Sequence, residues 1–324
     1  MSDIQPFQPV ENSPELYQLH DQARKLLLSS KAKATTKAYR SDWRDFEAWA
    51  EVNRSAALPA TPDTVILYLT SLNTQGMRIS TIRRRVATIS QAHQHAGHET
   101  PTRDRRVRAL LQGIARTGTV PVTKKKAIGV AEVKALIAVC DQSSLKGKRD
   151  RALVLLGFAS ATRRSELAAL NVADVEFVHD EGVVIHLRRS KTDQEGRGRL
   201  VGVPVGRHFQ TCPVIALQSW LQASGLTEGP LWRPINRHGG LRDGRLTDHA
   251  VATIIKALAK AAGLNPQLYS GHSLRSGFAT SASRAGAPES VIARQTGHRS
   301  IKMLREYVQQ GNVLVENAAR YLDL

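Results

Sequence analysis

Residues 269–307 carry three polar motifs in helical surroundings: Tyr-Ser-Gly-His-Ser-Leu-Arg at 269–275, Thr-Gly-His-Arg-Ser at 296–300 and Arg-Glu-Tyr at 305–307. His272 and Arg275 lie three residues apart, so on a helical turn both side chains project from one face. An imidazole beside a permanent cation suits an anionic phosphate. Tyr307 follows His298 by nine residues, and a phenol near two histidines is a potential nucleophile. Taken singly, such a pair is more often a solvated helix face, and such a tyrosine a half-buried helix anchor.

Two features upstream extend this set. Arg163 lies two residues before Ser-Glu-Leu at 165–167, and Lys191 lies in Ser-Lys-Thr within a polar, glycine-rich segment. The chain therefore presents Arg, Lys, His-x-x-Arg, His and Tyr in one order in a basic sequence. This order resembles the catalytic set of the tyrosine recombinases, the phage-integrase family. The resemblance implies a site-specific recombinase that cleaves and rejoins DNA strands through a 3′-phosphotyrosyl intermediate.

By this resemblance, five residues receive roles in phosphodiester chemistry. Arg163 and Arg275 clamp the phosphate, and Tyr307 attacks it. Lys191 gives a proton to the leaving 5′ oxygen, and His272 accepts or shares the proton of the nucleophile. The reaction then requires neither ATP nor a metal ion.

Two more residues complete the implied site. His298 stands where the family has His or Trp, and it hydrogen-bonds a nonbridging phosphate oxygen. Glu166 falls three residues after Arg163, where the family has an acidic residue that orients the site. The family usually has glycine at the position of Ala161 and an aliphatic residue at that of Arg164, so Arg164 remains the alternative arginine of this box.

The charge of the chain indicates a polyanionic partner. The net charge is +18 and the pI is near 10.4. Residues 1–127 hold 20 Lys and Arg against 11 Asp and Glu, and the remainder holds 26 against 17, so each part carries +9. Two equally basic parts favour a clamp around double-stranded DNA. An RNA-binding module fits this charge less well, because aromatic residues make up only 5% of the chain.

The N-terminal part has the pattern of a four-helix bundle. Helices are expected from Thr35, from Pro62 with Thr61 as N-cap, from Ser80 to about Gly97, and from Thr100-Pro101 to about Gly118. The last two are basic on their outer faces, which are either solvated or in contact with phosphates. The candidate DNA-binding arginines are Arg83, Arg84, Arg85, Arg103, Arg105, Arg106 and Arg108.

A segment without periodicity, residues 117–127, separates two patterned regions. We expect a helical DNA-binding domain at 1–116, with a flexible lead-in at 1–14, and a catalytic domain at 128–324. The linker contains Lys124, Lys125 and Lys126. By the resemblance it passes along the duplex, although solvated lysines in a linker need no special reason.

The C-terminal part is expected to be α+β, which makes the predicted fold mainly α with a small antiparallel β-sheet. Two β-branched runs, 183–187 and 200–203, flank the segment with Lys191 and predict a hairpin. Arg188, Arg189 and Arg197 are competing cations there. Helices are expected at 130–140, 151–160, 212–223 and 248–262.

Other classes of function are disfavoured. There is no phosphate-binding G-x-x-x-x-G-K-[ST] loop, no clustered acids for a two-metal nuclease, and no metal-ligand spacing for the two cysteines. The longest apolar run, 152–161, is too short to cross a bilayer, so we expect a cytoplasmic protein without a membrane partner. The resemblance implies a homotetramer on two DNA sites, with the apolar tail 308–324 docked on its own domain or on a neighbouring protomer. A type IB topoisomerase and a DNA-binding protein with a decayed site remain alternatives.

Overall fold

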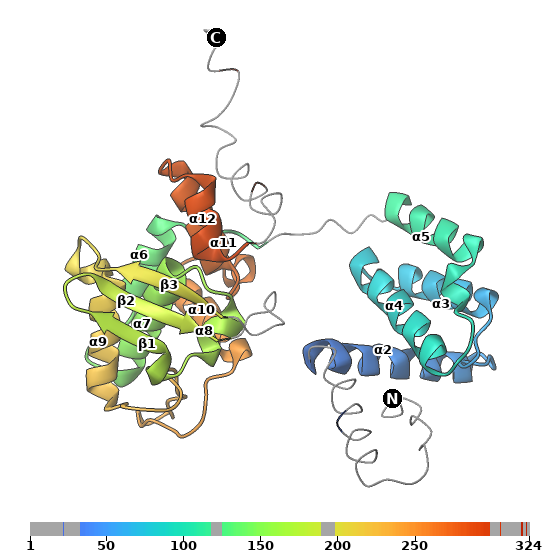
Figure 1. Cartoon of the computed structure of the whole chain (residues 1–324), viewed down its shortest axis with the longest axis horizontal. Coiled ribbons are helices and arrows are strands. Elements are labelled where there is room, and N and C mark those ends of the chain that lie inside the picture. The colour runs from blue at the N-terminus through green and yellow to red at the C-terminus, as the bar shows by residue number, and fades with distance from the viewer. Residues whose placement is uncertain are drawn as a thin grey trace. The chain divides into compact units, whose positions relative to one another are not determined.

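The computed structural model describes residues 22, 33–117, 125–188, 198–298, 305, 319 and 322. The chain divides into two compact units, Met1–Val122 and Thr123–Leu324 (Figure 1). This division falls inside the segment expected to be the linker. Among the described helices, none has the length and apolar character that crossing a membrane requires.

Helices form the N-terminal unit. Thr61 begins the second of them as expected, because its Oγ1 accepts the backbone N–H of Thr64 at 3.2 Å and Pro62 follows. Two expected boundaries were wrong. The next helix begins at Ile79 rather than after a Ser80 cap, and a break at Asp104 divides the last one. The elements are α2 (Lys33–Val52), α3 (Pro62–Thr74), α4 (Ile79–His95), η1 (Pro101–Arg103) and α5 (Arg105–Thr117).

The core of this unit contains packed aromatic rings. Phe46 lies with its ring centroid 4.9 Å from that of Tyr68 and 5.6 Å from that of Trp43. His93 is fully buried beside them, and its Nε2 accepts the backbone N–H of Ala60 at 2.8 Å. Helical spacing of apolar residues therefore folds these helices onto one core.

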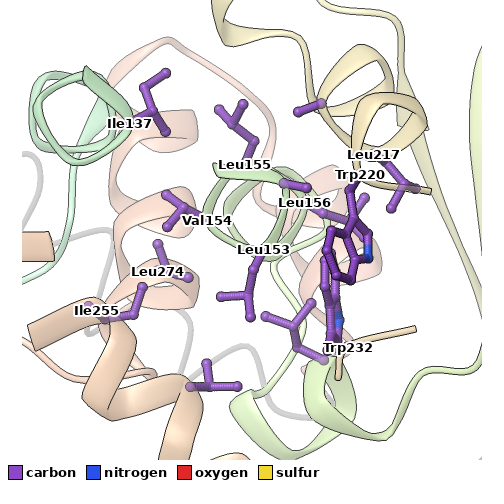
Figure 2. Packing of buried hydrophobic residues seen from close by; sticks show 14 of the residues in the cluster. Ile137, Leu153, Val154, Leu155, Leu156, Leu217, Trp220, Trp232, Ile255 and Leu274 are labelled. Carbon is purple, nitrogen blue, oxygen red and sulfur yellow. The ribbon is translucent and has the colours of Figure 1, made fainter. Parts of the chain in front are cut away.

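The second unit is built around α7. Four consecutive residues, Leu153 to Leu156, are buried, so this helix is covered on every side. Figure 2 shows them surrounded by residues of the neighbouring elements, with Trp220 and Trp232 stacked at a centroid distance of 6.4 Å. The helices of this unit are α6 (Val130–Ala138), α7 (Leu145–Ala159), α8 (Arg164–Ala169), η2 (Val172–Asp174), η3 (Phe209–Thr211), α9 (Pro213–Ser224), α10 (Asp248–Ala261), η4 (Pro266–Leu268), α11 (Ser273–Arg284) and α12 (Glu289–Thr296).

A three-stranded antiparallel sheet completes the unit and confirms the predicted fold class. The predicted hairpin strands are β2 (Gly182–Leu187) and β3 (Arg199–Pro204), and Ile185 pairs with Val201. The sequence missed β1 (Val175–Val178), which pairs with the other side of β2. This strand has four residues and its burial does not alternate, so a period-two pattern is too short there to identify it.

Residues 125–129 hold the start of α11 by backbone contacts. The N–H of Lys126 donates to the Leu268 carbonyl at 2.7 Å, and the N–H of Ile128 donates to the Ser273 carbonyl at 3.0 Å. At Gly277 a Cβ atom would lie 1.8 Å from the Ile128 oxygen, so this close approach requires glycine. The end of the expected linker and the residues directly after it therefore fix the helix that carries Arg275.

Candidate active site

The arginine box begins at the turn between α7 and α8. Arg163 is the N-cap residue of α8, and Glu166 lies in its first turn. Glu166 is buried and accepts two hydrogen bonds from Arg163, at 2.9 Å from the backbone N–H and at 2.5 Å from Nη1. Burial alone would raise the pKa of Glu166, but these bonds and the charges of Arg163 and Arg199 bring it below its ordinary value. Glu166 is therefore a buried carboxylate that fixes the direction of Arg163.

The neighbouring arginine points elsewhere. Arg164 Nη2 donates to Asp248 Oδ2 at 2.7 Å and so joins α8 to α10. Arg163 is one of the charges that depress the pKa of His298, and Arg164 is not among them. The two arginines therefore have different partners, Glu166 for Arg163 and Asp248 for Arg164.

Arg275 reaches the same turn from α11. Its residue exposure is 2%, and its Nη1 donates to the Ala161 carbonyl at 2.8 Å. Ala161 has a φ of 50°, in the left-handed region that favours glycine. Alanine therefore keeps the backbone shape that glycine would take at this place, and the carbonyl stays directed at Arg275.

His298 lies against Arg275 at the end of α12. Its Nε2 is 3.3 Å from Arg275 Nη2, and its Nδ1 is 2.7 Å from Thr296 Oγ1. A guanidinium only donates, so Nε2 is the acceptor and Nδ1 carries the proton. Burial first, and then Arg275, Arg163, His272 and Arg199, lower the pKa of His298 to about 4. His298 is thus neutral at pH 7.

His272 immediately precedes α11 and is exposed, whereas Arg275 one turn later is buried. Its backbone N–H donates to Ser270 Oγ at 3.3 Å. His272 also contributes to the low pKa of His298. The structure therefore brings His272, Arg275, His298, Arg163 and Glu166 into one neighbourhood.

Arg199, which sequence reasoning did not single out, lies in the same neighbourhood. Its Nη1 donates to the Gln295 carbonyl at 3.0 Å, and its Nη2 lies 3.4 Å from Glu166 Oε2. At the other arm of the hairpin, Arg188 pairs with Asp174 at 2.6 Å. Arg188 and Arg199 both lie at the end of a predicted hairpin strand, and no sequence signal distinguishes the half-buried Arg199 from the exposed Arg188.

Some predicted residues lie outside the described part of the chain: Lys191, Tyr307 and Lys124, as well as the hairpin cations Arg189 and Arg197. Of the two described linker lysines, Lys125 donates to the Gln267 carbonyl at 2.5 Å and Lys126 pairs with Glu132 at 3.0 Å. Within the described residues, no group of three or more His, Cys, Asp or Glu has the arrangement of a metal site.

The expectation for the N-terminal arginines needs a correction at Arg85. This residue is buried rather than on an outer face, and it pairs with Asp42, Asp45 and Tyr68. Arg84 also pairs with Asp42. Few acids lie near these arginines in the sequence, but acids of α2 neutralise them in the fold.

The remaining arginines of this set are exposed at α4, η1 and α5. Arg106 pairs with Asp63 at 2.7 Å and with Asp104 at 3.2 Å, and it is thereby partly neutralised. The others, which present charge at the surface, are Arg83, Arg103, Arg105 and Arg108.

The comparisons of this chain with known proteins are consistent with one another. Residues 126–312 match the model of the phage integrase family. An integrase/recombinase xerD homolog of Selenomonas ruminantium is 40% identical over 299 residues, which cover 91% of this chain and 87% of that protein. A lambda integrase dimer bound to a core site has a TM-score of 0.61 at 16% identity, covering 94% of this chain and 83% of that one. A lambda integrase tetramer bound to a Holliday junction has a TM-score of 0.57 at 17% identity, covering 90% and 76%.

Proposed function

Because this chain belongs to the phage integrase family of tyrosine recombinases, we propose that it cleaves and rejoins double-stranded DNA at specific sites through a 3′-phosphotyrosyl intermediate. The observation that carries this proposal is the meeting of Arg163, Arg275 and His298. The two guanidinium groups come from different elements, and both act on one half-buried imidazole. Such a concentration of fixed positive charge suits a phosphodiester whose charge grows in the transition state.

In this proposal the arginines hold the scissile phosphate. Arg275 is fixed by the Ala161 carbonyl, and Arg163 is fixed by Glu166, so neither needs to reorganise when the substrate binds. Both guanidinium groups donate to nonbridging oxygens. Their contribution is to the rate of cleavage more than to affinity, because preorganised donors act most strongly on the developing charge.

The covalent step then keeps the number of phosphorus–oxygen bonds constant. The phenol oxygen of Tyr307 bonds to phosphorus while the bond from phosphorus to the 5′ oxygen breaks. Lys191 supplies the proton for that oxygen, and His272 takes the proton of the phenol. Attack by the 5′ hydroxyl of a partner strand reverses the step. Since one phosphorus–oxygen bond replaces another, neither ATP nor a metal ion is needed.

His298 has to change its role when DNA binds. In the free protein its Nε2 accepts a hydrogen bond from Arg275. A nonbridging phosphate oxygen only accepts, so contact with it requires a proton on Nε2. The negative charge of the phosphate favours the cationic imidazole, and we propose that His298 takes up a proton as the phosphate enters.

The exposed arginines of the N-terminal unit are the proposed backbone contacts. Arg83, Arg103, Arg105 and Arg108 are at the surface, whereas the buried Arg85 is left out. We also propose Lys124, Lys125 and Lys126 of the linker as phosphate contacts. Because a lambda integrase neighbour is a tetramer on a Holliday junction, we propose the same assembly for this chain on two sites.

The function is tested by capturing covalent protein–DNA adducts from a panel of genomic fragments. The expected result is an adduct at a small set of sites, and exchange of strands between two plasmid copies of such a site. Tyr307→Phe is the matched control, which should bind the site without forming an adduct. Relaxation of supercoiled DNA without exchange would instead indicate a topoisomerase, and binding without any adduct would indicate a decayed site.

A further inference from the structure

We propose that Arg199 is a positioning residue for this site: it fixes the position of Glu166, and through it that of Arg163, relative to the turn that carries His298. This inference rests on the proposed function, because the register matters only if these groups bind one phosphate. Arg199 is the first residue of β3, so it comes from a different part of the chain than the residues it would align.

The contacts of Arg199 join three elements. Its Nη1 donates to the carbonyl of Gln295 in α12 at 3.0 Å, and its Nη2 lies 3.4 Å from Oε2 of Glu166 in α8. The same Glu166 oxygen accepts the backbone N–H of Arg163. One guanidinium from the sheet thereby links the arginine box to the helix that ends before His298.

The turn before His298 is packed directly on this guanidinium. Gly297 has a φ of 65°, and a Cβ atom there would lie 2.9 Å from Nε of Arg199. That Nε is buried and makes no hydrogen bond within the described parts of the chain. The guanidinium is therefore held through Nη1 and Nη2, whose partners are the Gln295 carbonyl and Glu166.

Gln295 reinforces the same junction from the other side. Its Nε2 donates to the Ala159 carbonyl at 2.9 Å and to the Gly202 carbonyl at 3.0 Å. Ala159 ends α7 just before the arginine box, and Gly202 lies in β3. The sheet, the box and the His298 turn therefore meet at two side chains, Arg199 and Gln295.

Burial and two neighbouring charges act on the guanidinium of Arg199. Burial first, and then the charge of Arg163, lower the pKa of Arg199, while Glu166 between the two cations opposes this effect. Arg199 is mostly buried, with 20% of its side chain exposed, and its two terminal nitrogens contact the Gln295 carbonyl and Glu166.

The alternative is that Arg199 only stabilises the fold. Three variants of the full chain separate the two roles: Arg199→Gln, the conservative Arg199→Lys, and Arg188→Gln as a matched loss of a hairpin cation away from Glu166. Two measurements are made on each. One is single-turnover cleavage beside DNA affinity, and the other is the pKa of His298 in the free protein by NMR.

Positioning predicts that Arg199→Gln lowers the cleavage rate by about 10²-fold, as expected for groups misplaced by an ångström, and changes affinity by less than about threefold. It also predicts a higher pKa for His298, because a nearby cation is gone. Arg199→Lys should recover part of the rate, and Arg188→Gln should change neither quantity appreciably.

An Arg199→Gln protein that cleaves at the wild-type rate would overturn the inference, as would one with an unchanged His298 pKa. Equal losses in Arg199→Gln and Arg188→Gln would also overturn it, because they would reflect the fold alone. If the wild type forms no covalent adduct, the proposed function fails. The His298 titration then still tests whether the charge of Arg199 acts on this imidazole in the free protein.

Discussion

Replacing Glu166 by glutamine should destabilise the C-terminal unit by about 3 kcal/mol at pH 7. The carboxylate is buried and receives a backbone and a side-chain hydrogen bond from Arg163 and a longer contact from Arg199. Glutamine keeps one acceptor but turns its NH₂ group toward a guanidinium. Hydrogen bonds to charged groups contribute about 1.5–3 kcal/mol each, and breaking a buried ion pair costs about 3–5 kcal/mol. For a unit of this size the loss corresponds to a fall in Tm of about 6–12 °C.

The pH dependence of this loss identifies its cause. The pKa of Glu166 lies below its ordinary value in the folded state. A depressed carboxyl pKa adds stability that is complete above the unfolded pKa of about 4.3 and is lost as the pH falls through the folded pKa. The difference between wild type and Glu166→Gln should therefore be full at pH 7 and shrink below about pH 4.3.

Urea unfolding followed by tryptophan fluorescence measures this difference, since Trp220 and Trp232 lie in the core of the same unit. Unfolding is recorded for both proteins at pH 7, 5, 4 and 3. A constant difference at all four values, or a difference below about 1 kcal/mol at pH 7, would refute the ionised Glu166 as the anchor of Arg163.

Three further predictions concern single residues. Arg163→Ala should slow cleavage by about 10²-fold or more with little change in DNA affinity, whereas Arg164→Ala should change the cleavage rate only slightly. Single-turnover kinetics measure both rates. A severe loss in Arg164→Ala with a slight one in Arg163→Ala would make Arg164 the arginine of the site. Lys191→Ala should cleave slowly but regain its rate when sulfur replaces the leaving 5′ oxygen, because a thiolate leaves without a proton. Equally slow cleavage of both substrates would show that Lys191 is not the general acid. Burial lowers the pKa of His93, so below about pH 6.5 the unfolded chain binds a proton that the folded chain does not, and stability should fall. Urea unfolding of the full chain at pH 7 and pH 5 measures this fall, and an unchanged pH dependence in His93→Gln would contradict it.

Local signals in the sequence predicted much of the fold. Thr61 was expected to cap a helix because its hydroxyl precedes an apolar-periodic run, and it accepts the backbone N–H three residues later. Thr247 caps the helix expected from residue 248 in the same way. The β-branched runs gave the paired strands β2 and β3 in the same way. These features depend on neighbours in the chain, so the sequence pattern contains them.

Features that depend on distant partners were not predictable in this way. The burial of Arg85 follows from Asp42 and Asp45 on α2, about forty residues away in the chain, and helical spacing does not identify such a partner. Likewise, Arg199 gains its place from Glu166 and from the end of α12. The resemblance to a family supplied Arg163, His272, Arg275 and His298 because their order is a property of the sequence.

The identity of the DNA-linked residue tests the central claim most directly. Trapped protein–DNA complex is digested with protease and nuclease, and mass spectrometry locates the peptide that retains a nucleotide. The proposed chemistry predicts a 3′-phosphate ester on Tyr307 and no modification of Tyr269, which is 2% exposed. Attachment at Tyr269 or Tyr321, or at a residue other than tyrosine, would contradict it.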